Sequence, residues 1–173
     1  GNDNITAGAG DDVISSATAN LDASDTIAGG DGTDTLSLTN ASTVVDADFT
    51  NVTGVETIMQ TTTAHNMTIT LGALSSAAGL TTITGGTGTN SYTLGAGHTA
   101  ALTVALAAGT DSVIGTNYTG ALTVTAAAAS ITSADTITGG TGTSDNLSIT
   151  GGNALTNAEM TIVTGFETFT VAT

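Results

Sequence analysis

Glycine and aspartate occur together in a short phrase that the chain repeats near its start. Residues 8–14 read GAGDDVI and residues 29–36 read GGDGTDTL, so a shift of 22 residues places Asp12 on Asp34. If the backbone coils with this period, the two carboxylates lie on the same corner of adjacent coils. Carboxylates held this close resist ionisation unless a cation lies between them. Calcium is suited to the position, because it takes several oxygen ligands in irregular geometry.

The glycines of the phrase have a matching role. A loop that turns its carbonyl oxygens toward an ion needs residues that adopt positive φ or pack without a Cβ, and glycine does both at low cost. We therefore expect four glycines to shape the calcium loop while the aspartates supply its charge. They are Gly8, Gly10, Gly30 and Gly32.

Further aspartates repeat the pattern less completely. Asp3 and Asp25 are also 22 residues apart, which predicts a second corner of the same kind. The phrase returns as GGTGTN at 85–90, where Asn90 replaces the aspartate, and as GGTGTSD at 139–145, where an inserted residue displaces Asp145. Both departures remove part of the expected ligand set. The candidate metal ligands outside the first corner are Asp3, Asp25, Asp111, Asp135 and Asp145.

The overall charge also calls for an external cation. Fifteen aspartate and glutamate residues face no lysine or arginine, which gives a formal net charge of −15. Self-repulsion of this size destabilises a compact state, and bound cations relieve it. The composition excludes nucleic acid and anionic membrane surfaces as partners, because both are bound through basic side chains. With no cysteine and only two separated histidines, His65 and His98, we expect neither disulfides nor a zinc site, and we place both histidines at the surface or at corners.

Larger repeats organise the rest of the chain. DTIAGG at 25–30 returns as DTITGG at 135–140, and FTNVTGVETI at 49–58 returns as MTIVTGFETF at 160–169, so residues 25–58 and 135–169 are two copies of one module. Glu56 and Glu167 occupy matching positions in these copies, which indicates a repeated structural role. We expect residues 1–173 to be one elongated repeat segment, a fragment of a larger protein, with no membrane-spanning stretch.

Local alternation predicts short strands. Apolar pairs such as Leu36/Leu38 and Ile69/Leu71 point to one side, with threonine and serine on the other. Short strands punctuated by glycine and aspartate at recurrences near 20 residues are typical of stacked coils. The predicted fold class is therefore all-β, a parallel β-solenoid of the β-roll or β-helix type, and a β-sandwich is the alternative. Residues 74–79 and 125–130 are candidates for helical turns.

The phrases at 8–14 and 29–36 resemble the nonapeptide G-G-x-G-x-D-x-U-x of RTX (repeats-in-toxin) proteins, which bind calcium in a β-roll. The remaining Thr-, Ala- and Gly-rich strands, with NVTGVETI at 51–58, resemble bacterial S-layer proteins and large secreted adhesins that carry RTX repeats. The resemblance implies type I secretion, calcium-dependent folding outside the cell, and self-association into a lattice or filament at the cell surface. A cell-surface polysaccharide is a further partner of such proteins.

These observations predict a non-catalytic structural component of an extracellular bacterial surface assembly. Two alternatives stay open, which are an RTX adhesin or other module that binds a glycan or ice, and the non-catalytic RTX tail of a secreted enzyme. The ice-binding alternative comes from Thr-x-Thr pairs, but these recur at uneven separations, which predicts no regular ladder of threonines. The pairs lie at 68–70, 82–84, 123–125, 136–138 and 168–170.

Overall fold

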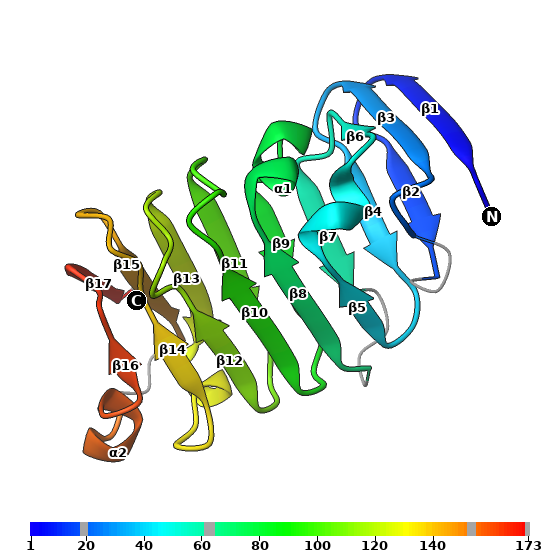
Figure 1. The fold of residues 1–173 in the computed structure, drawn as a ribbon. Helices are drawn as coiled ribbons and strands as arrows, with labels where there is room; N and C mark the ends of the chain where they lie inside the picture. Colours follow the sequence, from blue (N-terminus) through cyan, green and yellow to red (C-terminus); the bar gives the residue numbers. More distant parts are fainter. Residues whose placement is uncertain (18–20, 61–64, 152–154, 172–173) are drawn as a thin grey trace.

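The computed structural model describes residues 1–17, 21–60, 65–151 and 155–171 of the chain. Within these ranges the chain forms mainly short β-strands, and every strand pair is parallel (Figure 1). The strands are β1 (Asn4–Ala9), β2 (Val13–Ser16), β3 (Thr26–Asp31), β4 (Thr35–Leu38), β5 (Ser42–Val44), β6 (Val52–Thr53), β7 (Thr57–Gln60), β8 (Met67–Leu71), β9 (Thr82–Thr84), β10 (Asn90–Leu94), β11 (Leu102–Leu106), β12 (Asp111–Ile114), β13 (Leu122–Ala127), β14 (Thr136–Thr138), β15 (Asn146–Thr150), β16 (Val163–Thr164) and β17 (Thr168–Val171).

Three sheets divide these strands. The longest sheet has eight strands in the order β17-β15-β13-β11-β9-β7-β4-β2, a second has six in the order β16-β14-β12-β10-β8-β5, and a third has the order β1-β3-β6. Strands that are consecutive in the sequence belong to different sheets. Between two neighbouring strands of one sheet, the chain therefore always forms a strand of another sheet. The expectation of an all-β chain with parallel strands is confirmed.

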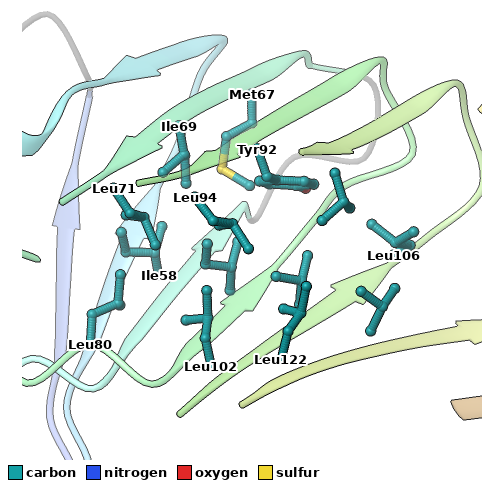
Figure 2. Close-up of a cluster of buried hydrophobic side chains, with 14 of the residues drawn as sticks. Ile58, Met67, Ile69, Leu71, Leu80, Tyr92, Leu94, Leu102, Leu106 and Leu122 are labelled. Carbon is teal, nitrogen blue, oxygen red and sulfur yellow. The ribbon is translucent and has the colours of Figure 1, made fainter. Parts of the chain in front are cut away.

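The register of the longest sheet stacks equivalent apolar residues on one another. Ile14 pairs with Leu36, Leu36 with Ile58, and the same rank continues through β9, β11, β13 and β15 to Phe169 on β17. Adjacent members of this rank are between 20 and 25 residues apart. Side chains of the six-stranded sheet face this rank and complete an aliphatic core, in which Tyr92 is a rare aromatic residue (Figure 2). Burial is complete in the middle of the stack, where Leu36, Ile58 and Tyr92 are all 0% exposed.

The outward faces carry hydroxyl side chains in ranks of their own. In the longest sheet one rank contains Thr35, Thr57, Thr82, Thr103, Thr123, Asn146 and Thr168. In the six-stranded sheet another contains Thr43, Thr68, Ser91, Ser112 and Thr136. The Thr-x-Thr pairs themselves are not stacked on one another in the described residues, because two of them lie on β8 and β14 of the six-stranded sheet and the other three lie on β9, β13 and β17, alternate strands of the longest sheet.

Helices are few and short. They are η2 (Asp46–Phe49), α1 (Ala73–Ala78), η3 (Ala128–Ser130) and α2 (Asn157–Met160). The turn expected at 74–79 is therefore α1, which ends at Gly79 with φ of 101°. Of the turn expected at 125–130, only the last three residues are helical, because residues 125–127 extend β13. No helix in the described ranges is long and apolar enough to cross a membrane.

Candidate metal centre

Asp12 and Asp34 occupy equivalent positions directly before β2 and β4. The register pairs Val13 with Thr35, so the predicted shift of 22 residues is the offset between these strands. The backbone N–H of Asp12 donates to Oδ1 of Asp34 over 2.8 Å. Asp34 is fully buried, and Asp12 is half-buried. The two carboxyl groups that sequence spacing places together thus lie on adjoining strands at one corner of the sheet.

Glu56 continues this arrangement one strand further. It lies directly before β7, and its Oε2 accepts the backbone N–H of Asp34 over 2.8 Å. The Glu56 N–H in turn donates to the carbonyl oxygen of Asp34 over 3.1 Å. We call Asp12, Asp34 and Glu56 the acidic column. Sequence reasoning missed this contact of Glu56, although its distance of 22 residues from Asp34 is a signal that could have found it.

The acidic column uses only part of its acceptor capacity. Oδ2 of Asp12 and Oδ2 of Asp34 are both buried and accept no hydrogen bond among the described residues. A buried charged oxygen without a partner is costly, since it has lost water and gained nothing in exchange. The chain has no lysine or arginine that could compensate these oxygens. The corner therefore holds negative charge that no side chain of this protein neutralises.

Glycine allows backbone oxygens to approach the same corner. A Cβ at Gly29 would overlap both the carbonyl oxygen of Gly54 and Oδ2 of Asp34, and a Cβ at Gly30 would overlap the carbonyl oxygen of Gly8. Gly30 also has a φ of 116°, in the region that favours glycine. Gly8, Gly10 and Gly32 have positive φ as well. The carbonyl oxygen of Gly54 and Oδ2 of Asp34 thus both lie close to Gly29, where the missing side chain leaves room.

The second predicted corner has a different chemistry. Asp25 is 2% exposed, and its Oδ1 accepts the N–H of Asp3 while its Oδ2 accepts the N–H of Asp22, each over 2.9 Å. These backbone hydrogen bonds, first that from Asp3, hold the pKa of Asp25 below its usual value against the opposing effect of burial. Asp3 itself is exposed. Both oxygens of Asp25 are therefore satisfied by the main chain.

Asp135 repeats this pattern in the second module. Its Oδ1 accepts the N–H of Asp111 over 2.8 Å, and its Oδ2 accepts the N–H of Thr132 over 2.7 Å. The donor three residues earlier, Thr132, takes the place of Asp22 in the first module. Like Asp25, Asp135 is buried with both oxygens paired to backbone N–H groups.

Asp145 occupies the position of Asp34 despite the inserted residue. Its N–H donates to Oε2 of Glu167 over 2.8 Å, as Asp34 does to Glu56. However, Oδ1 of Asp145 accepts the N–H of Leu122, and its Oδ2 accepts the N–H of Gly140 over 2.7 Å. The insertion is absorbed within the loop, and it leaves neither oxygen of Asp145 without a donor. Leu122 also stands where the first column has the carboxylate of Asp12.

Asn90 shows how an amide fills the aspartate position of the phrase. Its Oδ1 accepts the N–H of Met67, as Asp34 accepts that of Asp12. Its Nδ2 donates to the carbonyl oxygens of Gly86 and Gly88, over 2.8 and 3.2 Å, and to Oδ1 of Asp111 over 2.9 Å. The amide hydrogens therefore supply positive charge to three surrounding oxygens. An aspartate has no such hydrogens, and an ion is the other means of joining oxygens in this way.

Asp111 remains partly uncompensated. It is 1% exposed, and its Oδ2 is buried without a hydrogen-bond partner in the described part of the chain. Burial, assisted by the charge of Asp135, raises the pKa of Asp111 to about 6, although the hydrogen bonds from Asn90 oppose the shift. Asp111 thus has the same unpaired oxygen as Asp12 and Asp34, but the neighbouring carboxylate of Asp135 has both oxygens paired with backbone N–H groups.

Side chains alone do not complete a metal site. Among the described residues, no group of three or more histidine, aspartate or glutamate side chains is arranged to hold a metal ion. A cation at the corner of Asp12 and Asp34 therefore needs backbone carbonyl ligands as well. Calcium is commonly bound by such mixed sets of carboxylate and carbonyl oxygens.

His98 lies in the turn between β10 and β11, which is one of the corner positions expected, but it is not at the surface. It is 0% exposed, and its Nδ1 lies 3.1 Å from Oγ of Ser75 in α1. Its ring also lies 6.0 Å from that of Tyr118. Burial lowers the pKa of His98, while the Asp46 carboxylate and the Leu80 carbonyl partly oppose the shift. His65 is exposed, as expected.

Comparison of the chain with protein-family models, with curated proteins and with solved structures finds no match.

Proposed function

We propose that this chain is a parallel β-solenoid segment of a secreted bacterial surface protein, and that calcium stabilises its fold. Three parallel sheets, with consecutive strands in different sheets, support the solenoid. The likeness of residues 8–14 and 29–36 to RTX repeats supports calcium and type I secretion. In this proposal the segment is a structural part of an S-layer-like lattice or filament outside the cell, and it has no catalytic role.

One observation carries the proposal for calcium. Before β2 and β4, the carboxylates of Asp12 and Asp34 each have one buried oxygen without a hydrogen-bond donor among the described residues, and the carbonyl oxygen of Gly54 lies beside Gly29 together with Oδ2 of Asp34. Where the phrase has Asn90 instead, amide hydrogens bridge the neighbouring oxygens. A calcium ion performs this bridging for the aspartate version, since it is cationic and accepts oxygens from both backbone and side chains.

The proposed mechanism couples metal binding to folding. Inside the cell free calcium is scarce, and a chain of net charge −15 stays expanded through self-repulsion. Outside the cell, calcium joins adjacent repeats and its binding free energy adds to the free energy of folding. The acidic column is the place where this happens, because Asp12 and Asp34 belong to different strands that must associate.

Thermal unfolding with calcium or EGTA tests the proposal. Extracellular calcium sites have Kd values of about 10⁻⁴ to 10⁻³ M, so about 10 mM calcium stabilises the folded state by about 1.4 to 2.7 kcal/mol per site. We expect the wild type to gain stability of this size. Asp34→Asn keeps the acceptor for the Asp12 N–H and adds amide donors, so it should fold in EGTA and lose the calcium response.

Asp31→Asn is the matched control, since Asp31 is an exposed acid of the same loop and its replacement removes the same charge. It should keep the calcium response of the wild type. If the wild type unfolds at the same temperature in EGTA and in calcium, the proposal is overturned. An undiminished response of Asp34→Asn would show that calcium binds elsewhere.

A further inference from the structure

The repeat supplies an internal comparison for the loop of Asp34, because Asp145 occupies the same position in the second module. In both modules the N–H of this aspartate donates over 2.8 Å to the glutamate that lies 22 residues later. In both, a Cβ at the first glycine of the loop, Gly29 or Gly139, would overlap a carbonyl oxygen. The two loops therefore share a framework, and their differences concern the remaining oxygens of the aspartate.

The second carboxylate oxygen of this aspartate has a donor in only one module. The N–H of Gly140 donates to Oδ2 of Asp145 over 2.7 Å. Gly30 is the equivalent of Gly140 in the first module, but Oδ2 of Asp34 is buried and accepts no hydrogen bond among the described residues. One loop thus closes onto its carboxylate through its own main chain, and the other leaves the carboxylate open.

The lengths of the strand and of the loop explain this difference. β3 continues through Gly30 because β1 runs beside it over the same length. β14 ends at Thr138, where its paired neighbour β12 also ends, so Gly140 lies beyond the strand ladder. Five positions separate Gly140 from Asp145, whereas four separate Gly30 from Asp34. The extra residue gives the second loop the length to turn its N–H onto Oδ2.

Negative charge is divided between the two parts of the chain in the same sense. Ten of the fifteen acidic residues lie within residues 1–56, and the other five lie within 111–167. The N–H that reaches Oδ1 of Asp145 comes from the uncharged Leu122, where the first loop has the carboxylate-bearing Asp12. Self-repulsion, which destabilises a compact state, therefore acts mainly on the first third of the chain.

We infer that calcium acts at this corner in the first module alone, and that in the second module the N–H of Gly140 takes the place of the ion. The loop at 139–145 is then complete without metal, and β13 and β15 beside it need no calcium. In a solenoid each coil contacts only its neighbours, so stability varies locally along the stack. The inference locates the calcium dependence of the proposed function within the chain, and it rests on that proposal.

Hydrogen exchange of the whole chain, in about 10 mM calcium and in EGTA, tests the inference because it reports local opening strand by strand. The strands to compare are β4 and β15 (Figure 1). Each directly follows one of the two loops, and each has a paired neighbour on both sides, so neither is an edge strand. With a Kd of about 10⁻⁴ to 10⁻³ M, calcium should slow exchange in β4 by about ten- to a hundredfold, whereas exchange in β15 should change by less than about twofold.

The same substitution should have opposite effects in the two loops. Asp34→Asn adds amide hydrogens where Oδ2 lacks a donor, so exchange in β4 should be slow in EGTA and should no longer respond to calcium. Asp145→Asn places an amide NH2 group against the N–H of Leu122 or of Gly140. It should speed exchange in β15 at least about tenfold, and by the same factor in EGTA and in calcium. Each variant removes one negative charge, so each is the charge control for the other.

The outcomes separate this inference from the proposal on which it rests. If calcium slows exchange in β15 as much as in β4, the second module also responds to the ion, and the inference is overturned while calcium-stabilised folding stands. If Asp145→Asn slows exchange in β15 in EGTA, the closure of its carboxylate by Gly140 is overturned. If calcium changes exchange in neither strand, the proposed function itself fails.

Discussion

The charge of Asp111 is the feature whose removal has the clearest expected effect. Asp111 is buried at the start of β12, its Oδ2 has no donor among the described residues, and its pKa is raised to about 6. At neutral pH the folded protein must therefore hold in its interior a negative charge that Asn90 compensates only in part. Asp111→Asn keeps an oxygen that can accept the amide hydrogen of Asn90 and removes this charge. We expect the variant to be more stable than the wild type at neutral pH.

The size of the effect follows from the pKa difference. The pKa of Asp111 is 3.8 in the absence of the fold and about 6 within it. Since one pKa unit corresponds to about 1.4 kcal/mol, ionisation costs the folded state about 3 kcal/mol at neutral pH. The folded state binds the proton more tightly than the unfolded state, so this stability is present below pH 3.8 and is lost as the pH rises through 6. The gain of Asp111→Asn should therefore be near zero at pH 4 and approach about 3 kcal/mol above pH 7.

Urea unfolding in EGTA, measured at pH 4, 5.5 and 7.5, checks this expectation. Asp31→Asn is the control for the loss of one negative charge, because Asp31 is exposed and its replacement reports only the general relief of self-repulsion. The relevant quantity is the difference between the two variants at each pH. If this difference does not increase between pH 4 and pH 7.5, the buried oxygen of Asp111 is compensated in solution and the reasoning is wrong.

Two further predictions concern the close backbone contact at Gly30 and the burial of His98. Gly30→Ala should lower the free energy of unfolding, measured in urea, by at least about 1 kcal/mol more than Gly8→Ala does. Both glycines have positive φ, so both variants strain the backbone, but only the new Cβ at position 30 also overlaps a carbonyl oxygen. Equal costs would show that the close approach of the Gly8 carbonyl is absent. The pKa of His98 should lie below 6.5 when its ring is titrated by NMR, so its contribution to stability is present above pH 6.5 and is lost as the pH falls. A titration midpoint of His98 at or above 6.5 contradicts its burial.

The period of the first repeat was predictable, because several constraints coincide in it. Gly8 on Gly30, Asp12 on Asp34 and Ile14 on Leu36 all require the same shift, and the strand register has it. Alternating aliphatic residues likewise predicted which side of each strand is buried. Such agreement between turn residues and core residues is strong evidence for the period, since turn geometry and core packing select residues for different physical reasons.

In the later repeats, the residues that become neighbours in the sheets could not be predicted from the sequence, for a physical reason. Between adjacent strands of the longest sheet the offset varies from 20 to 25 residues, because loops, η3 and α1 absorb extra chain without disturbing strand pairing. Sequence separation then conceals which threonines are neighbours, and the outward hydroxyl ranks emerge only from the register. The burial of His98 was hidden in the same way, since it depends on Ser75 of α1, which lies 23 residues earlier.

Residue type alone also could not distinguish the aspartates, but their immediate neighbours do. Asp25 and Asp135 follow Asp22 and Thr132 by three residues, and the N–H of that earlier residue donates to the second carboxylate oxygen. The three aspartates that retain a buried, unpaired oxygen all follow a glycine by two residues, and they are Asp12, Asp34 and Asp111. In these three loops no N–H of the described residues donates to the second carboxylate oxygen. Exposed Asp3 and Asp31 also follow a glycine by two residues, so this spacing goes with an unpaired oxygen only where the fold buries the aspartate, whereas Asp25 and Asp135 are completed by the turn that precedes them.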